Sequence, residues 1–290
     1  GGPMNERVPV LKTYKLFIDG KFPRSESGRS YTLKDSRGRA LANVCQATRK
    51  DFRNAVVAAR TAQSGWAKRS GYNRGQILYR LGELVEGRRD QFVAELKQQG
   101  SPVGEARKEV NLTIDRLVCF AGWADKYQQL FSTVNPVASP HFVFSVPEPT
   151  GVVALVASQK SGLIGLVSLI CPIILGGNTV VALASESEPL TAITFSEVLA
   201  AGDVPAGVVN ILTGFRSELL EQMAGHMDVN ALVYTGEKKA ERTLIQQQAS
   251  LNVKRVIVPR IRSWKSGTVE SPYLIMDTQE VKTTWHPVGL

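Results

Sequence analysis

Residues 148–214 read EPTGVVALVASQKSGLIGLVSLICPIILGGNTVVALASESEPLTAITFSEVLAAGDVPAGVVNILTG and decide the fold. Short runs rich in β-branched residues alternate in this stretch with longer segments of apolar periodicity. This alternation is typical of a parallel sheet whose faces are covered by helices. The pattern continues beyond the stretch and predicts five strands, at 151–157, 179–183, 208–212, 230–234 and 254–258. Five strands joined by crossover helices imply a doubly wound, Rossmann-like α/β fold with helices on both faces of the sheet.

The part of the chain before this core is predicted to hold a hairpin, three helices and an extended strand. Polar and apolar residues alternate in 14–22 around the pair Asp19-Gly20, a strong signal for two strands joined by a tight turn. Residues 141–146 lie between prolines and read as an extended strand. Apolar residues at helical spacing predict the helices at 49–68, 71–100 and 102–130.

Several motifs of the core closely resemble the cofactor-binding domain of the aldehyde dehydrogenase superfamily. The resemblance covers about 14–285, and in the family the segments matching 141–146 and 279–285 join an oligomerisation sheet. It implies that the catalytic lobe, which family members carry between the last core strand and the terminal strand, is missing here. The matching motifs are Gly151-Val152-Val153, Gly177-Asn178-Thr179-Val180-Val181, Ser185-Glu186, Pro189-Leu190-Thr191-Ala192 and Pro205-Ala206-Gly207-Val208-Val209-Asn210.

The resemblance also implies how the chain is divided. An amino-terminal hairpin and helices would pack on a Rossmann-like sheet core, and a small β element for oligomerisation would be added to it. A polar linker would replace the catalytic lobe, and residues 273–277 and 279–285 would form the terminal strand. The expected regions are 1–130 for the hairpin and helices, 131–150 for the oligomerisation strand segment, 151–259 for the sheet core and 260–290 for the linker and terminal strand.

The residues that carry the chemistry of the family have been replaced. Lys160 stands where the resemblance places an asparagine that donates to the oxyanion, and a mobile charge is no substitute for a fixed amide. Pro259 stands where it places the general-base glutamate. The nucleophilic cysteine belongs to the missing lobe, and Cys45, Cys119 and Cys171 are expected to be reduced structural thiols. We therefore expect no catalytic residues and no enzyme activity.

The cofactor site retains only remnants of the family pattern. Glu186 keeps the acid that binds the adenosine ribose, whereas Leu183 replaces the lysine beside it. Thr235 and Gly236 keep the start of the loop that holds a pyrophosphate at a helix N-terminus. The turn that is Gly-Phe-Gly in the family ends in Arg216, whose side chain would occupy space that the adenine side needs. No cofactor is expected, and NAD binding stays the alternative.

Composition limits the other classes of function. The net charge of +9 is mostly dispersed, and the one tight basic group lacks interleaved aromatic residues other than Trp264, so we predict a solvated basic face and no nucleic-acid partner. The three histidines are isolated, so no metal site is expected. The longest apolar run, 163–175, is too short for a membrane span, and the cytoplasm is the expected compartment. The basic group consists of Lys254, Arg255, Arg260, Arg262 and Lys265.

The pattern as a whole favours a non-catalytic domain that acts in oligomerisation or scaffolding. It resembles the carboxy-terminal half of aldehyde dehydrogenase family 16, whose members look like two units in tandem, the second without its catalytic lobe. Edge strands near 14–22, 141–146 and 279–285 would pair with another copy or with a full aldehyde dehydrogenase-like half. A second hypothesis is a regulatory NAD-binding part of an oxidoreductase, and a third is an active aldehyde dehydrogenase.

Overall fold

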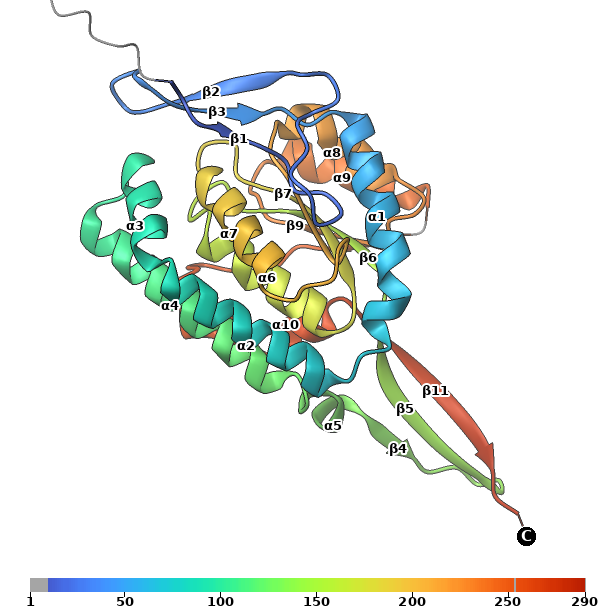
Figure 1. Cartoon of the computed structure of the whole chain (residues 1–290). Coiled ribbons are helices and arrows are strands. Elements are labelled where there is room, and N and C mark those ends of the chain that lie inside the picture. Colours follow the sequence, from blue (N-terminus) through green and yellow to red (C-terminus); the bar gives the residue numbers. More distant parts are fainter. Residues whose placement is uncertain (1–9, 253, 290) are drawn as a thin grey trace, which may run out of the picture.

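A computed structural model describes residues 10–252 and 254–289 and has a five-stranded parallel sheet at its centre (Figure 1). The strand order is β10-β9-β6-β7-β8, which confirms the predicted doubly wound topology. Each strand lies where the β-branched runs predicted it, with ends shifted by one residue at most. The strands are β6 (Val152–Val156), β7 (Thr179–Leu183), β8 (Val209–Leu212), β9 (Ala231–Tyr234) and β10 (Arg255–Ile257).

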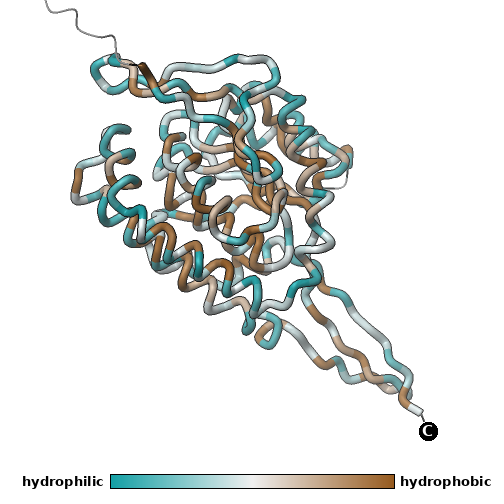
Figure 2. The backbone as a smooth tube through the Cα atoms, in the orientation of Figure 1, coloured by the Kyte–Doolittle hydropathy of each residue, from teal (hydrophilic) through white to brown (hydrophobic). Residues whose placement is uncertain are grey.

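Both faces of the sheet are buried, because successive side chains of each strand enter two different hydrophobic clusters. Val153 and Leu155 of β6 belong to the cluster that also contains residues of α2, α3, α4, α6 and α7. Val152 and Val156 belong to the cluster shared with α1, α8 and α9. Figure 2 shows apolar residues concentrated around the sheet. The helices are α1 (Arg49–Ala67), α2 (Gly71–Gly87), α3 (Arg89–Gln98), α4 (Val103–Trp123), α6 (Ile164–Leu175), α7 (Leu190–Ala201), α8 (Arg216–Gly225) and α9 (Lys239–Ser250).

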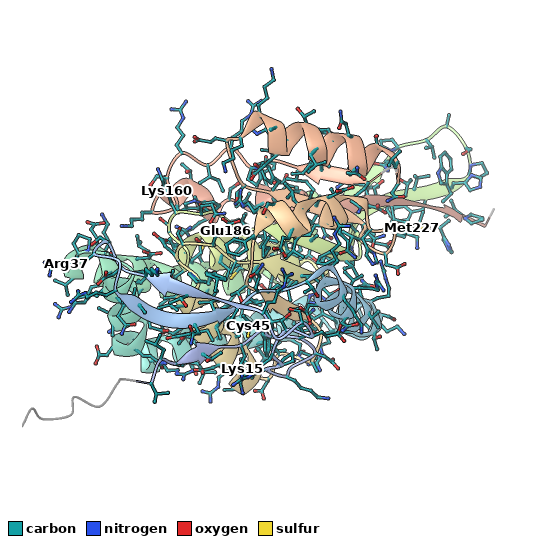
Figure 3. The ribbon with its side chains drawn as sticks, turned by 90° about the horizontal axis from the view of Figure 1, so that it is seen from above. Lys15, Arg37, Cys45, Lys160, Glu186 and Met227 are labelled. Atoms are coloured by element: carbon teal, nitrogen blue, oxygen red, sulfur yellow. The ribbon has the colours of Figure 1, made fainter. Side chains whose placement is uncertain are left out.

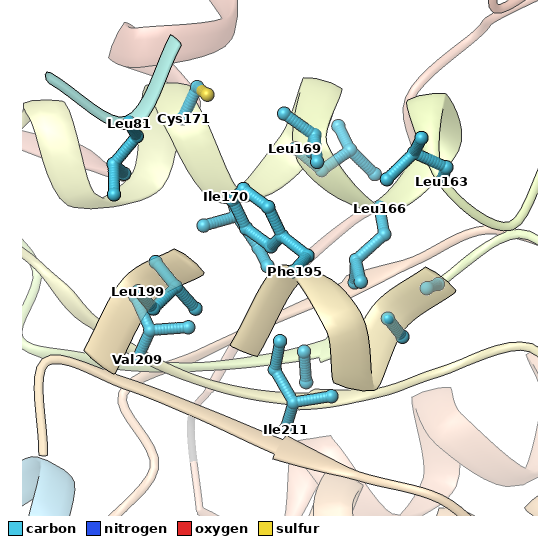
Figure 4. Packing of buried hydrophobic residues seen from close by; sticks show 14 of the residues in the cluster. Leu81, Leu163, Leu166, Leu169, Ile170, Cys171, Phe195, Leu199, Val209 and Ile211 are labelled. Carbon is cyan, nitrogen blue, oxygen red and sulfur yellow. The ribbon is translucent and has the colours of Figure 1, made fainter. Parts of the chain in front are cut away.

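Helix α6 lies inside the molecule, with every one of its residues buried. Figure 4 shows Phe195 of α7 pointing toward Ile170 of α6, with Ile211 of β8 nearby. This packing explains the apolar run in the sequence as a buried helix. No helix in the described part of the chain is long and apolar enough to cross a bilayer.

Two of the predicted helices end earlier than their periodicity suggested. The predicted helix 71–100 is interrupted at Arg88, whose φ of −111° and ψ of 16° are not helical, so α2 and α3 are separate. Gly87 weakens the helix at this point, and the Arg88 guanidinium is anchored by Glu197 at 2.7 Å. The predicted helix 102–130 ends at Trp123, and a short α5 (Tyr127–Phe131) follows.

The amino-terminal segment forms the predicted turn and a short hairpin around it, in which the Leu16 N–H donates to the carbonyl oxygen of Pro23 at 3.0 Å. Asp19 and Gly20 have φ values of 55° and 71°, and the backbones of Ile18 and Lys21 exchange hydrogen bonds across them. The flanking residues do not form an exposed pair of strands, because Phe17 is buried and bridges to Ile211 of β8. This segment therefore contributes to the core and offers no free edge. A small sheet of order β1-β3-β2, not predicted, precedes the helices: β1 (Thr13–Tyr14), β2 (Ser30–Lys34) and β3 (Ala40–Cys45).

A three-stranded antiparallel ribbon, which we call the arm, projects away from the body of the molecule (Figure 1). It is formed by β4 (Thr133–Asn135), β5 (His141–Pro149) and β11 (Gln279–Pro287) in the order β11-β5-β4. Strand β11 pairs with β5 over nine residue pairs without a register shift. The extended segment predicted at 141–146 is thus confirmed, and it pairs with the predicted terminal segment.

The connection between β10 and the arm is ordered and partly helical. It contains a 3-10 turn at Gly267–Glu270 and α10 (Tyr273–Met276), so the prediction that 273–277 belongs to a strand is wrong. Pro272 precedes α10, and Ile275 is fully buried in the cluster that contains α6. Packing against α6 therefore decides the conformation of this short apolar run, which periodicity alone leaves open.

Candidate functional site

A cleft of about 1100 Å³ lies where the parallel strands β6, β9 and β10 end. Within the sheet, β7 and β8 lie on one side of β6, and β9 and β10 lie on its other side. The carboxyl ends of β6 and β9 therefore form the topological switch point, where doubly wound folds bind their ligands. Segments 158–161, 235–238 and 258–265 line the cleft together with Arg216 and Arg242.

The crevice between β6 and β9 is filled by the side chain of Arg216, the first residue of α8. Its Nη2 donates to the carbonyl oxygens of Ala157 and Thr235, at 2.5 and 2.9 Å. Its Nη1 lies 3.2 Å from Glu241 Oε2, and this carboxylate also accepts a hydrogen bond from the Tyr234 hydroxyl. Burial, followed by the hydrogen bond to Glu241, raises the pKa of Tyr234 to about 12. The three side chains thus form a nearly buried, mutually satisfied network.

Thr235 and Gly236 lie beside this network, at the switch point where the sequence predicted them. The Thr235 hydroxyl donates to the carbonyl oxygen of Val156 at 2.8 Å and so ties β9 to β6. A Cβ at Gly236 would collide with the Tyr234 hydroxyl and would come within 2.9 Å of Arg216 Nη1. Protein side chains therefore already occupy the space above this glycine.

Glu186, the predicted ribose ligand, has a structural use in this chain. Its Oε1 accepts the backbone N–H of Arg216 at 2.7 Å, which satisfies a donor at the N-terminus of α8. Its own backbone N–H donates to Gln159 Oε1 at 2.8 Å, and its carbonyl oxygen accepts the Tyr31 hydroxyl at 3.1 Å. The acid that was expected to hold a ribose is engaged as a helix cap.

The two positions at which the resemblance implies catalytic residues both lie on the cleft. Lys160 is exposed on the loop after β6, and Pro259 follows β10 on the other side of the cleft. Figure 3 shows Lys160 near the outside of the molecule, with Glu186 closer to its centre. The structure therefore brings Lys160, Pro259, Thr235 and Gly236 together, while Glu186 touches the site through Arg216. None of the side chains at the two replaced positions is a carboxylate or an amide.

The cysteines lie away from this cleft. All three are free thiols, with Cys45 and Cys171 buried and Cys119 half-buried. Burial raises the pKa of the Cys171 thiol and of the Cys119 thiol, so both are held in the protonated, unreactive form. Among the described residues no group of three or more histidines, cysteines and acids is close enough to hold a metal ion.

Sequence reasoning did not single out two charged residues of α4 that shape the walls of the cleft. Arg116 is fully buried; its Nη1 donates to Ser168 Oγ at 2.7 Å and to the carbonyl oxygen of Trp264 at 3.0 Å, and so fixes the loop after β10. Glu109 Oε1 accepts the N–H of Ile164 at the start of α6, at 3.2 Å, and burial raises its pKa. The two lie seven residues apart, on the face of α4 that is otherwise apolar, and this spacing was a readable signal.

One side chain of the basic group is not part of a solvated face. Lys254 is buried, and its Nζ donates to the carbonyl oxygens of Ala224 and His226 at 2.8 Å each. These carbonyls lie at the C-terminus of α8, where a cation is favourable. Burial lowers the pKa of Lys254 to about 8. The prediction of a solvated basic face is therefore wrong for Lys254.

The residues at the switch point do not fit NAD in the way the resemblance implies. Arg216 fills the crevice between the two strand ends, and the Glu186 carboxylate is bonded to the backbone of α8. Leu183, at the position of the family lysine, is buried in the sheet. A dinucleotide in this crevice would have to displace a salt bridge and several hydrogen bonds.

Comparisons with known proteins agree with this architecture. The model of the aldehyde dehydrogenase family matches residues 22–259. The chain is 33% identical over 256 residues to the mitochondrial benzaldehyde dehydrogenase of Antirrhinum majus, covering 86% of this chain and 47% of that protein. It is also 33% identical over 259 residues to the cytosolic 10-formyltetrahydrofolate dehydrogenase of Xenopus laevis, covering 87% of this chain and 28% of that protein.

Solved structures give the same result. An aldehyde dehydrogenase from Burkholderia cenocepacia superposes with a TM-score of 0.81 at 29% identity, covering 86% of this chain and 50% of that chain. The NAD⁺ complex of an aldehyde dehydrogenase from Bacillus cereus superposes with a TM-score of 0.80 at 25% identity, covering 85% and 50%. The chain thus spans about half the length of these relatives and a smaller share of the frog protein.

Proposed function

The chain belongs to the aldehyde dehydrogenase family, and from this premise we propose that it is a non-catalytic unit of the family that serves in oligomerisation or scaffolding. The replaced positions support this proposal, since Lys160 and Pro259 face the cleft where the resemblance places an amide and a carboxylate. Cys119 and Cys171 offer no alternative nucleophile, because burial raises the pKa of both thiols. We expect no aldehyde-dependent formation of NADH by this chain.

The observation that carries the proposal is the open edge of the arm. Within residues 10–252 and 254–289, no strand pairs with the outer edge of β11, so the edge of a nine-residue strand is left open. Val281 and Trp285 on this strand are 63% and 57% exposed. Long, open strand edges with exposed apolar side chains are templates for pairing with another chain. In a protein that stays alone such an edge is a liability.

The partner that we propose is a second copy of this chain or a full aldehyde dehydrogenase-like unit. We infer that the chain forms one unit of a larger two-unit protein of the kind found in aldehyde dehydrogenase family 16. The length comparison supports this inference, because the chain spans about half of the relatives that it matches. The free cysteines favour a reducing compartment, and we propose the cytoplasm.

The test is the mass of the chain in solution, measured by light scattering. We expect a dimer or larger assembly that dissociates when Val281 is replaced by lysine. Val57→Lys is the matched control, because Val57 is 61% exposed on α1 and lies outside the arm. A monomer with the same mass in all three proteins would refute homotypic pairing. A complex with a full aldehyde dehydrogenase that forms equally well with the Val281 variant would refute the role of the arm.

The alternative function is a regulatory NAD site that serves a catalytic partner. It would require Arg216 to leave the crevice, with loss of its bonds to Ala157, Thr235 and Glu241. We therefore propose that NAD is not a ligand of the resting fold. Calorimetric titration with NAD tests this directly, and micromolar binding that is lost in Thr235→Val would favour the alternative.

A further inference from the structure

The cleft at the strand ends has a strong excess of positive charge. Seven basic side chains line it, against the single carboxylate of Glu237. The chain as a whole carries a net charge of +9, so much of its excess positive charge is gathered around one hollow. The basic residues are Lys160, Arg216, Lys238, Arg242, Arg260, Arg262 and Lys265.

Among the described residues, carboxylates neutralise two of these seven cations. Arg216 is paired with Glu241, and Lys265 is paired with Glu105. In the part of the chain that the structure describes, the other five have no carboxylate within ion-pairing distance. They come from three separate segments, after β6, at the start of α9 and after β10, and they surround the same space. The free cations are Lys160, Lys238, Arg242, Arg260 and Arg262.

The backbone at the cleft adds to this positive potential. Helix α9 begins at Lys239, and its N-terminus has no side-chain cap. The partial positive charge of a helix N-terminus favours anions. Arg242 Nη2 donates to the carbonyl oxygen of Gly236 at 2.9 Å, and this bond holds the loop before α9 against the cleft. The backbone N–H groups at the start of α9 and the basic side chains therefore lie around the same cleft.

Like charges gathered in a hollow repel one another and attract counter-ions. A cleft with low-dielectric walls strengthens this field, and Val258, Pro259 and Ile261 supply such walls. A ligand with several adjacent negative groups would satisfy the free cations together, whereas a single carboxylate would satisfy one or two. The five free cations therefore favour ligands that carry several negative groups close together.

We propose that this cleft binds a small polyanion with clustered phosphate groups, at one site in each chain. The network of Arg216, Glu241 and Tyr234 forms the floor of the site and fills the crevice between β6 and β9, so a dinucleotide is not the preferred ligand. Nucleic acid is disfavoured, because the cations surround one hollow and the only aromatic side chain among its lining residues is Trp264. The proposal does not depend on assembly through the arm.

The test is titration calorimetry of the whole chain with inositol hexakisphosphate and with inorganic tripolyphosphate, and with NAD for comparison. We expect one site per chain, weakened by salt, with NAD at least about tenfold weaker because it carries fewer charges. The double variant Arg260→Ser/Arg262→Ser should bind at least about tenfold more weakly than the natural sequence. Both arginines are exposed, and circular dichroism checks that the variant is folded.

A matched control removes two exposed cations elsewhere. Lys34→Ser/Arg37→Ser changes the net charge by the same amount, on the small amino-terminal sheet and its turn, and neither residue lines the cleft. Unchanged affinity in this control supports a built site. Equal losses in both double variants, no binding at all, or NAD binding as tightly as inositol hexakisphosphate would each overturn the proposal.

The phosphates could belong to a free metabolite or to a lipid headgroup. Binding of the chain to vesicles with and without phosphatidylinositol bisphosphate distinguishes the two sources. Binding to these vesicles that depends on Arg260 and Arg262 would support the same site with a lipid source. Binding to soluble inositol hexakisphosphate without vesicle binding would assign a free ligand. Mass measurements on the same samples are independent of both results, so failure of this proposal is distinguishable from failure of the oligomerisation proposal.

Discussion

The crevice between β6 and β9 and the arm formed by β5 and β11 differ in how completely their polar groups are satisfied. In the crevice, Arg216 bonds to two carbonyl oxygens and a carboxylate, and the protein itself supplies every partner. In the arm, β11 pairs on one edge, and no strand of the described part of the chain pairs with its other edge. A binding partner forms few new hydrogen bonds where the polar groups of the chain are already paired. It forms the most where backbone N–H and C=O groups are unpaired. The contrast teaches that one fold can fill the crevice between two strand ends with its own side chain and, within the described residues, leave the edge of a long strand unpaired.

The strongest way to break the comparison is to empty the crevice. Arg216→Met would leave the Glu241 carboxylate and two strand-end carbonyls without their cation, and we expect a loss of about 3 kcal/mol in the free energy of unfolding. Urea denaturation measures the loss. The control is Arg29→Met, because Arg29 is 51% exposed and its surface pair with Glu218 should contribute less than about 1 kcal/mol. Equal effects of the two variants would contradict the view of the crevice as a satisfied network.

A smaller change tests one hydrogen bond of the network in the crevice. Tyr234→Phe removes the hydroxyl that donates to Glu241 but keeps the ring in the core, and we expect a loss of about 1 to 2 kcal/mol. The control is Tyr79→Phe on the exposed surface of α2, which should change stability by less than about 0.5 kcal/mol. A neutral result for Tyr234→Phe would mean that Arg216 alone satisfies the carboxylate.

The arm should respond differently from the body in hydrogen exchange. We expect amide protons of β6 to exchange only on global unfolding, because both edges of this strand are paired. The outward amides of β11 should exchange rapidly in a dissociated Val281→Lys chain and slowly in the assembled protein. Mass spectrometry of exchanged peptides covering 279–287 and 152–156 measures both. Equal protection of the outward β11 amides in the two assembly states would contradict pairing through that edge.

The last expected effect is a pH dependence at the other end of α8. The pKa of Lys254 is lowered from 10.5 to about 8 by burial, so between these values the unfolded chain binds more protons than the folded one. The free energy of unfolding should therefore rise with pH across this window. The same contribution should disappear as the pH falls back toward 8. The gain across this window should be up to about 3 kcal/mol relative to Lys254→Met, in which this titration is removed, since each pKa unit corresponds to about 1.4 kcal/mol. A constant difference between the two proteins from pH 8 to 10.5 would contradict the shift.

The sequence allowed the sheet to be predicted closely, because buried parallel strands are nearly continuous apolar runs bounded by turn residues. The same reasoning failed at 273–277, where contact with α6 makes a short apolar run helical. It failed at Arg88, because an interruption of a helix leaves the apolar periodicity on either side intact. The strands β2 and β3 were not predicted, because a short apolar run such as β3, in which Ala42, Val44 and Cys45 are buried, cannot be told from a helix segment by periodicity alone.

The candidate site could be predicted in position but only partly in chemistry. The replacement of a glycine by Arg216 correctly indicated a side chain in the crevice. The sequence did not show that Glu241 would neutralise that arginine from 25 residues away. It also did not show that Glu186 would cap α8. Such pairings depend on how the ends of strands and helices meet, and one sequence read locally does not contain that information.

The pairing of β11 with β5 also has a consequence for the order in which the protein is made and folds. The whole parallel sheet lies between the two strands in the sequence. Their residue pairs are therefore the furthest apart along the chain of all pairs among the described strands β1 to β11. Loop closure over such a distance is slow compared with the folding of local elements. During synthesis, most of β5 waits without a partner on that edge until residues 279–287 leave the ribosome, while β6 to β10 already have their neighbours. The arm is thus completed last, and an apolar strand of the unfinished chain is open to chaperones or to wrong partners for the longest time.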